Sequence, residues 1–176
     1  MARSSKVPRQ SLIRHFEVLE DTLIATRVEN DPDLDSEQCD LVKHPRFYFF
    51  DLGVVNALRG SFDLSGDRIG GLWEHFVYNQ LMNSIQAGDT EHKIFNFRTR
   101  GGLEVDFIVS HGSKKFAIEC KAAARVSESD YRNLIAIERY YQKVIKILVY
   151  QGKIEKKENG VWILPLPKAL SVMGLL

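Results

Sequence analysis

Three strand-length segments follow one another between residues 93 and 121, and they constrain the fold more than any other feature of the sequence. The segments Lys93–Arg98, Glu104–Ser110 and Lys115–Lys121 are rich in residues that favour strands, and turns that contain glycine separate them. The turn between the second and third segments is short enough for the two strands to pair antiparallel. We therefore expect a sheet at the centre of the fold.

Helices are expected on both sides of these strands. Apolar side chains recur at helical spacing over residues 69–86. A second helix is expected at Ser129–Gln142, with Ser127 or Ser129 as its cap. Later elements are a strand at Val144–Tyr150, a hairpin around Asn159-Gly160 and a short helix within Pro167–Leu176. The order helix, three strands, helix, strand predicts an α/β fold with a mixed sheet.

The segment before residue 63 is expected to form a separate unit, so the predicted boundaries are 1–62 and 63–176. Its elements are, in order, an amphipathic helix after Pro8, a strand within Thr22–Val28, an acidic loop at Glu29–Gln38, a strand at Phe47–Asp51 and a short helix at Gly53–Leu58. This order is what the end of a winged-helix unit looks like. The unit is too small for a core of its own, so either it packs on the later elements or the chain begins within a longer protein.

Composition excludes several classes of protein. The chain has 176 residues, of which 44% are hydrophobic and 27% charged, as in ordinary globular domains. Its apolar runs are too short to cross a bilayer, so no membrane partner is expected. The basic start lacks the apolar core of a secretory signal, and two distant cysteines offer no disulfide framework, so the cytoplasm is the simplest setting. A net charge of +1 neither supports nor excludes DNA as a partner.

Two carboxylates on neighbouring strands are the strongest chemical signal. Alternation along a strand places Glu119 and Lys121 on one face, and it places Asp106 with Ile108, away from Val105. Antiparallel pairing would bring Asp106 and Glu119 together at one end of the sheet. Mg²⁺ prefers a few carboxylate oxygens together with waters and a phosphate. A lysine beside such a site can hold or deprotonate water, or stabilise charge that develops on a phosphate.

Each of these residues also has a plain structural interpretation. Glu119 and Lys121 could form a surface ion pair that contributes less than about 1 kcal/mol. Asp106 could be a residue at a strand end. Glu74, which is the third acid and lies on the preceding helix, could simply be solvated. Glu104 is expected to be a solvated acid at the start of its strand.

Other polar residues carry weaker signals. Arg98 and Arg100 flank the site in the sequence and could bind the phosphates of a nucleic acid, or could be solvated. His75 and His92 have no partner at metal-ligand spacing, so they are expected to be structural or solvated. Cys120 is expected to be a small buried apolar residue.

Asp106, twelve intervening residues and then Glu119-Cys120-Lys121 resemble the D–(D/E)xK signature of the PD-(D/E)XK nucleases, with Glu74 as their helix-borne acid. Further motifs narrow the resemblance to the C-terminal domain of a group of prokaryotic AAA+ ATPases (domain of unknown function 4143), from about Leu12 to Leu166. These motifs are Phe47-Tyr-Phe-Phe-Asp51-Leu-Gly53, Gly71-Leu-Trp-Glu74-His-Phe-Val77, Asn96-Phe-Arg98-Thr, Glu104-Val-Asp106-Phe and Ile118-Glu-Cys-Lys121.

The resemblance implies a restriction-endonuclease-like αβββαβ core that follows a winged helix and a P-loop ATPase. It implies Mg²⁺ as a cofactor, with Asp106, Glu119 and Glu74 as metal ligands and Lys121 as a catalytic lysine. It also implies DNA as a partner, and an ATPase portion of the same polypeptide or a protein partner. The chain contains no G-x-x-x-x-G-K-[ST] motif, so ATPase activity cannot reside in it.

Three functions remain open at this point. The domain could be a Mg²⁺-dependent DNA endonuclease. It could be a catalytically inactive recognition or regulatory module of an ATPase, or a protein-interaction domain, with its acids kept as a buried polar network. The winged-helix-like segment could itself be the reader of DNA.

Overall fold

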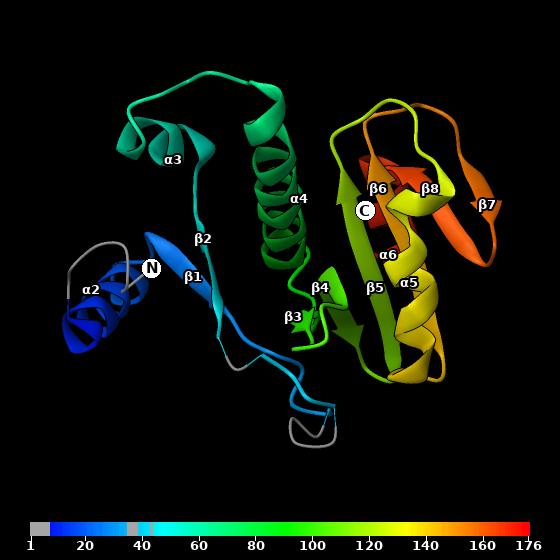
Figure 1. Cartoon of the computed structure of the whole chain (residues 1–176), viewed down its shortest axis with the longest axis horizontal. Coiled ribbons are helices and arrows are strands. Elements are labelled where there is room, and N and C mark those ends of the chain that lie inside the picture. Colours follow the sequence, from blue (N-terminus) through cyan, green and yellow to red (C-terminus); the bar gives the residue numbers. More distant parts are fainter. Residues whose placement is uncertain (1–7, 35–38, 43) are drawn as a thin grey trace.

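The computed structural model describes residues 8–34, 39–42 and 44–176, and the elements fall into two groups along the chain (Figure 1). The first group comprises α2 (Arg9–Asp21), β1 (Ala25–Val28), β2 (Arg46–Phe49) and α3 (Leu52–Leu58). The second comprises α4 (Gly66–Ala87), β3 (Lys93–Arg98), β4 (Glu104–His111), β5 (Lys114–Lys121), η1 (Glu128–Asp130), α5 (Arg132–Ala136), η2 (Ile137–Arg139), β6 (Val144–Tyr150), β7 (Lys156–Glu158), β8 (Val161–Pro165) and α6 (Leu166–Met173). Within the described ranges, none of the helices has the length and apolar content needed to span a bilayer.

Six strands form one mixed sheet in the order β3-β4-β5-β6-β8-β7. β3, β4 and β5 pair antiparallel, as their short connections predict. β6 joins β5 in parallel, and β8 joins β6 in parallel, while β7 pairs antiparallel with β8 at the edge. A parallel neighbour requires a crossover connection, which the η1-α5-η2 segment supplies between β5 and β6. The predicted α/β class with a mixed sheet is confirmed.

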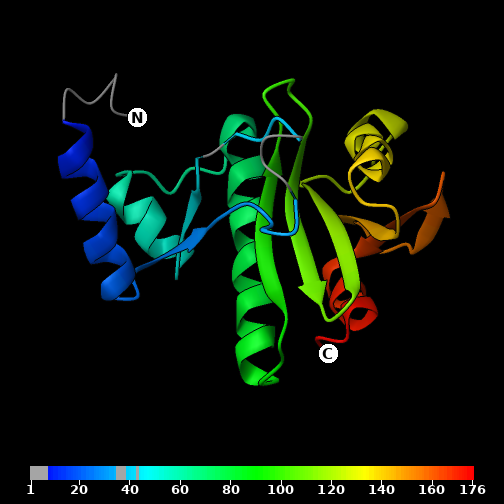
Figure 2. The same cartoon turned by 90° about the horizontal axis from the view of Figure 1, so that it is seen from below.

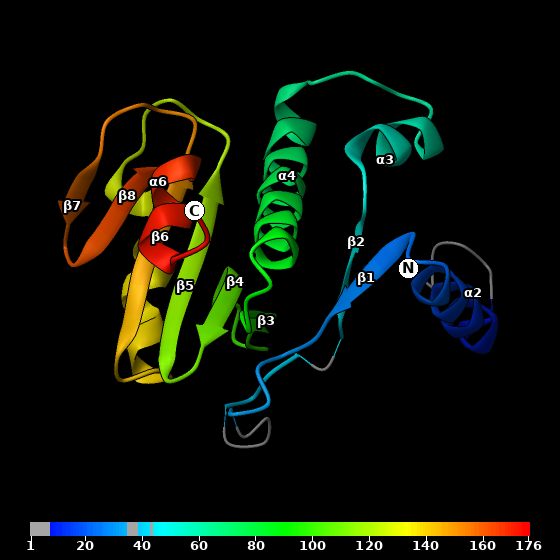
Figure 3. The same cartoon turned by 180° about the vertical axis from the view of Figure 1, so that it is seen from behind.

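Helices cover both faces of this sheet. α5 lies in front of it in Figure 1, and α6 lies in front of it in the view from behind in Figure 3. One core, beside α4 and α6, contains Leu81, Phe107 and Leu170. A second core, beside α5, contains Ile108 and Leu134. The strands between these layers are buried on both faces, which explains their nearly continuous apolar sequence.

Most predicted boundaries agree with the structure. The predicted strand at Val144–Tyr150 is β6, and the predictions for β3, β4 and β5 differ from the structure by at most a terminal residue. Asn159 and Gly160 have φ values of 49° and 76°, which is the left-handed backbone that a two-residue hairpin turn requires. The predicted hairpin is therefore confirmed, with β7 and β8 as its strands.

The helix predicted at Ser129–Gln142 is wrong in its continuity, because the segment is divided into η1, α5 and η2. Ser127 caps η1 as predicted, and its main-chain N–H donates to the Asp130 carboxylate at 2.8 Å. Tyr131 then leaves the helical conformation, with a φ of −126°, and is buried in the core beside α5. The helix is therefore interrupted at the residue whose ring is buried in the core beside α5.

β1 and β2 form their own antiparallel sheet, and α4 lies between this sheet and the large one (Figure 2). The ring of Tyr48 stacks on the ring of Tyr78 in α4, with the centroids 4.1 Å apart. Asn30 also forms an isolated bridge with Asn96 of β3. The N-terminal unit thus packs on the later elements of the chain. Residues 35–38 of the predicted acidic loop lie outside the described residues.

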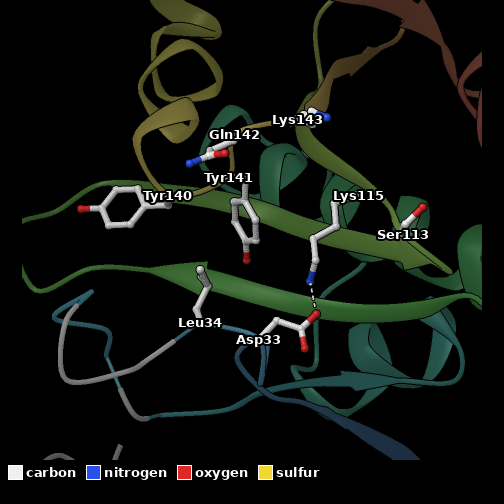
Figure 4. Close-up of a pocket in the computed structure, with 8 residues that line it drawn as sticks. All are labelled: Asp33, Leu34, Ser113, Lys115, Tyr140, Tyr141, Gln142 and Lys143. Atoms are coloured by element: carbon white, nitrogen blue, oxygen red, sulfur yellow. Dashed lines mark hydrogen bonds and ion pairs between the residues drawn. The ribbon is translucent and has the colours of Figure 1, made fainter.

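Asp31 fastens the N-terminal unit to the large sheet at the start of β5. Its side chain is 0% exposed, and its carboxylate accepts hydrogen bonds from the Lys115 ammonium and, at 3.0 Å, from the Tyr141 hydroxyl. Asp33 pairs with the same ammonium at 2.8 Å, but its side chain is 74% exposed. Figure 4 shows Asp33, Lys115 and Tyr141 around a pocket of about 280 Å³.

Asp31→Ala is expected to lower the free energy of unfolding by about 3 kcal/mol, because it leaves the buried Tyr141 hydroxyl without its acceptor and leaves the Lys115 ammonium only the exposed carboxylate of Asp33. Asp33→Ala is the matched control, since it removes an exposed partner of the same lysine and should lower the free energy of unfolding much less. Urea denaturation followed by circular dichroism measures both variants. Equal losses in the two variants would contradict the assignment of Asp31 as the structural anchor.

Candidate functional site

A β-bulge in β4 sets the position of Asp106. The pairing of β3 with β4 shifts register there, because Phe95 pairs with Ile108 whereas Phe97, two residues later, pairs with Val105, three residues earlier. Val105 and Ile108 consequently lie in the same core, beside α5. Asp106 instead stands on the side of α4 with Phe107, near Arg46. The predicted alternation, with Asp106 on the face of Ile108 and Val105 on the other, is therefore wrong because the bulge interrupts it.

The carboxylate of Asp106 closes the gap that the bulge opens. The ladder between β4 and β5 ends at the pair Phe107 and Ile118, and beyond this pair the two strands part. Asp106 Oδ2 accepts a hydrogen bond from the main-chain N–H of Cys120 at 2.8 Å, in the place where a strand carbonyl would otherwise lie. Asp106 is thus fixed against β5 by a main-chain group.

Glu119 and Lys121 end β5 as a partly buried ion pair. Ala117 lies in the core beside α5 and Cys120 in the core beside α4, so alternation places Glu119 and Lys121 on the α5 side. Lys121 Nζ lies 3.1 Å from Glu119 Oε1, and the glutamate side chain is only 11% exposed. This burial distinguishes the pair from an ordinary surface ion pair.

Glu74 projects from α4 toward β2. Its Oε1 atom accepts a hydrogen bond from the Tyr48 hydroxyl at 2.5 Å and one from Arg46 Nη1 at 2.9 Å. Arg46 and Tyr48 are two residues apart on β2, so their side chains leave the same face of that strand. Glu74 is therefore bound by protein donors, and the simple solvated interpretation of it is wrong.

The guanidinium of Arg46 stands among three carboxylates. Besides its bond to Glu74, Arg46 Nη1 lies 3.9 Å from Asp106 Oδ1, and Nη2 pairs with Glu104. Arg98 approaches the other oxygen of Glu104 at 3.4 Å. The prediction that Glu104 is a solvated acid is therefore wrong, because two arginines bind its carboxylate.

Sequence reasoning missed Arg46 and Tyr48 as members of this cluster. Arg46 precedes Glu74 by 28 residues and belongs to a separate small sheet, so no local spacing connects them. The one available signal was the alternation of Arg46 and Tyr48 on a strand that precedes, with α3 between them, the helix that carries Glu74. Such a pattern gains meaning only when the packing of β2 against α4 is known.

Burial and like charges hold the Asp106 carboxyl in an unusual state. Burial raises the pKa of Asp106 well above its ordinary value, and the nearby charges of Glu119 and Glu74 raise it further. Burial also raises the pKa of Glu119, although the adjacent Lys121 ammonium opposes this effect. The charges of Asp106 and Glu119 thus influence each other at the end of the sheet where β4 and β5 part, although alternation sets the two side chains on different sides.

Lys121 remains protonated at neutral pH. Burial by itself would lower the pKa of its ammonium, but the charge and hydrogen bond of Glu119 outweigh that effect and raise it. A lysine in this state can donate hydrogen bonds and stabilise negative charge. It is unsuited to remove a proton from water, so one of the roles considered for it, that of a base, is disfavoured.

The two predicted phosphate-binding arginines occupy different surroundings. Arg98 lies at the rim of the cluster through its contact with Glu104, and its side chain is 57% exposed. Arg100 pairs with Asp40 at 3.3 Å, which ties it to the connection between β1 and β2. The structure thus places Arg98 beside the acids and does not bring Arg100 to them.

The acids suit a hard divalent cation by type, since Mg²⁺ prefers carboxylate oxygens. Within residues 8–34, 39–42 and 44–176, no three histidine, cysteine, aspartate or glutamate side chains form a group that could hold a metal ion as they stand. A positive group, the guanidinium of Arg46, already lies against Glu74 and Asp106. The donor atoms are thus of the type that Mg²⁺ prefers, whereas their arrangement here serves the guanidinium of Arg46.

The histidines and Cys120 have structural surroundings, as expected. His75 Nε2 lies 2.7 Å from the carbonyl oxygen of Phe49, and burial lowers its pKa. His92 contacts the Met173 carbonyl oxygen at 2.9 Å. Cys120 is buried in the core beside α4, and burial raises the pKa of its thiol, so the thiol stays protonated.

Comparison with known proteins places the central part of the chain in one family. Residues 69–169 match a family described as a domain of unknown function (DUF4143). The match contains all but the first turn of α4, the strands β3 to β8 and the residues Glu74, Asp106, Glu119 and Lys121, whereas Arg46 and Tyr48 precede it. No curated protein matches the chain.

Asp106→Asn is expected to stabilise the metal-free protein at neutral and alkaline pH. Because the folded pKa of Asp106 is raised, the folded chain holds a proton that the unfolded chain releases, so stability falls as the pH rises from the ordinary aspartate value toward the raised one. Asparagine cannot ionise and can still accept the bond from Cys120. We expect a gain on the order of 1 kcal/mol at pH 8 and a flatter pH dependence.

Urea denaturation at pH 5 and pH 8, with a chelator present, measures this effect. Asp63→Asn is the control, because Asp63 is an exposed acid remote from the cluster in sequence. A loss of stability in Asp106→Asn at pH 8 would show that the contact of the carboxylate with Arg46 outweighs its burial and its repulsion by Glu119.

Proposed function

The chain belongs to the DUF4143 family, and we propose that it is a nuclease-type domain that acts on nucleic acid through a Mg²⁺-dependent phosphodiesterase site. The observation that carries this proposal is the coupling of Asp106, at a β-bulge, with the Glu119-Cys120-Lys121 segment of the neighbouring strand. The succession of α4, three antiparallel strands, a helical crossover and a parallel strand is consistent with a restriction-endonuclease-like core. Bulges and perturbed carboxyl pKa values are both common at active sites.

In this proposal Asp106 and Glu119 would hold the cation, with Glu74 as a further ligand, directly or through water. A bound Mg²⁺ would polarise the phosphate and lower the pKa of water. Lys121, which stays protonated, would donate hydrogen bonds to the phosphate oxygens as negative charge develops there. Hydrolysis would break the bond between phosphorus and the leaving oxygen as water adds to phosphorus.

In the same proposal, Arg98 would position a nucleic acid. Its side chain is 57% exposed at the rim of the acid cluster, so a backbone phosphate could approach its guanidinium. Contacts of this kind fix the orientation of a nucleic acid without reading its sequence. We propose DNA as the nucleic acid, with Arg98 as a positioning residue and Arg100 in at most a peripheral role.

An ATPase portion or a protein partner is a further part of the proposal. Large apolar side chains are exposed on the N-terminal elements and the segment that follows α3, and they are Ile13, Val18, Leu23, Phe50, Leu58, Phe62 and Leu64. Such a concentration is typical of surfaces that contact another protein. Cys39 and Cys120 are both free thiols, which is consistent with a reducing cytoplasm. A winged-helix origin of the N-terminal unit belongs to the same proposal.

A second candidate function is a catalytically inactive recognition or regulatory module. The observation in its favour is the set of contacts that Arg46 makes with Glu74, Glu104 and Asp106, since a network satisfied by protein groups can persist without a metal. In that case the acids would serve to orient the N-terminal unit on the sheet. Metal binding separates the two candidates.

Replacing Glu119 or Lys121, which form the ion pair at the end of β5, tests the nuclease proposal. Glu119→Gln and Lys121→Met are each expected to reduce Mg²⁺- or Mn²⁺-dependent DNA cleavage about 100-fold or more, because the first weakens a ligand of the cation and the second removes positive charge at the reacting phosphate. Lys114→Met is the matched control, since Lys114 is an exposed lysine at the other end of the same strand. Cleavage of labelled single- and double-stranded oligonucleotides gives the rates, and calorimetry gives the affinity for Mn²⁺.

The outcomes discriminate between the candidates. Cleavage that survives Lys121→Met would exclude the proposed role of the lysine. Metal binding by the unaltered protein without any cleavage would favour the inactive module. A protein that neither binds Mn²⁺ nor cleaves DNA would overturn the metal-dependent proposal as a whole.

A further inference from the structure

Arg46 is the positively charged side chain that contacts Glu74, Glu104 and Asp106 together. Four carboxylates, those of Glu74, Glu104, Asp106 and Glu119, lie with three cationic side chains, those of Arg46, Arg98 and Lys121. If all were ionised, the group would carry one net negative charge. Without Arg46 it would carry two, which is the charge that a divalent cation neutralises.

The contacts of Arg46 involve atoms that a metal ion would also need. Its Nη1 atom lies 2.9 Å from Glu74 Oε1 and 3.9 Å from Asp106 Oδ1, so one guanidinium nitrogen lies between two of the proposed ligands. Mg²⁺ binds carboxylate oxygens at about 2.1 Å. A metal ion bound to these oxygens on the side where Nη1 lies would overlap with the guanidinium, and from any side its charge would repel that of the arginine. The two cations therefore compete for the same carboxylates.

The strand that carries Arg46 is anchored independently of this contact. Tyr48 stacks on Tyr78, and Arg46 itself pairs in register with Val28 of β1. The Tyr48 hydroxyl also holds the same Glu74 oxygen. Displacement of Arg46 therefore requires its side chain to move, while β2 keeps its place against α4.

We propose that Arg46 is an intramolecular competitor of the divalent cation, through which the N-terminal unit controls loading of the site. This inference rests on the proposed metal-dependent function. In the closed state the guanidinium contacts Glu74, Glu104 and Asp106 and offsets part of their negative charge. In the loaded state the cation takes its place against Glu74 and Asp106. Any partner that draws the Arg46 side chain away from these carboxylates would open the site to metal, while β2 keeps its place against α4.

The test is the affinity of the full chain for Mn²⁺, measured by calorimetry in the absence of DNA. Arg46→Gln is expected to bind Mn²⁺ at least about tenfold more tightly than the unaltered protein, within the usual range for coupling between two binding events. Arg27→Gln is the matched control. Arg27 lies on the partner strand β1 and is similarly half-buried, but its guanidinium pairs with Glu20 of α2, so its replacement should leave the affinity unchanged.

Thermal unfolding supplies a second readout that does not depend on catalysis. Without metal, Arg46→Gln should melt at a lower temperature than the unaltered protein, because its carboxylates repel one another. Saturating Mn²⁺ should raise its melting temperature more than it raises that of the unaltered protein. If Arg46→Gln does not fold without metal, Arg46→Lys replaces it in the test, since lysine keeps the charge but lacks the two-pronged contact. An affinity gain of about fivefold is then expected, at the low end of such coupling.

Two results would overturn the inference in distinguishable ways. Equal Mn²⁺ affinity in the unaltered protein and in Arg46→Gln would show that the arginine does not compete, and it would leave the metal-dependent function standing. Failure of a folded Arg46→Gln protein to bind Mn²⁺ would overturn both the competition and the proposed function.

Discussion

A buried carboxylate needs hydrogen bonds or an opposite charge, or else it keeps a proton. The contacts around Asp106 follow from this requirement. The bulge in β4 turns this side chain onto the α4 side and ends the ladder with β5. The Cys120 N–H that the parted strands expose then becomes a partner for the carboxylate. One main-chain donor is too little for a buried charge with Glu119 nearby, and the raised pKa of Asp106 expresses that deficit. The positive charge of Arg46, which lies on β2, partly offsets this deficit and lowers the pKa of Asp106.

The N-terminal unit is joined to the large sheet by charges of opposite sign at its two ends. At the start of β5 the unit supplies an acid, Asp31, to the ammonium of Lys115. Near the end of β5 it supplies a positively charged side chain, Arg46, to the acids on β4 and α4. A slip of the unit along the sheet would break both contacts at once. Its placement is therefore specified by charge as well as by the stacking of Tyr48 on Tyr78.

The strands of the large sheet could be predicted because their apolar runs are bounded by strong turn residues, and Asn159-Gly160 has the backbone that its sequence demands. The face occupied by Asp106 could not be predicted, since a bulge is a property of pairing between strands. Arg46 escaped prediction for a related reason, because its partners are distant in sequence and meet it only through packing. The interruption at Tyr131 likewise reflects burial of a ring and not a local helix-breaking residue.

The same contacts support a nuclease-type site and an inert network, and the difference between them lies in whether the central cation can exchange. Removal of one partner from a buried ion pair is costly, so an arginine fixed by packing would make the cluster structural. Arg46 is one-quarter exposed on its side chain, and its contact with Asp106 is long at 3.9 Å. Its strand is held by other residues, so release of the guanidinium would not unfold the unit. These features favour an exchangeable cation, and they make the cluster a site that can fold before it is loaded.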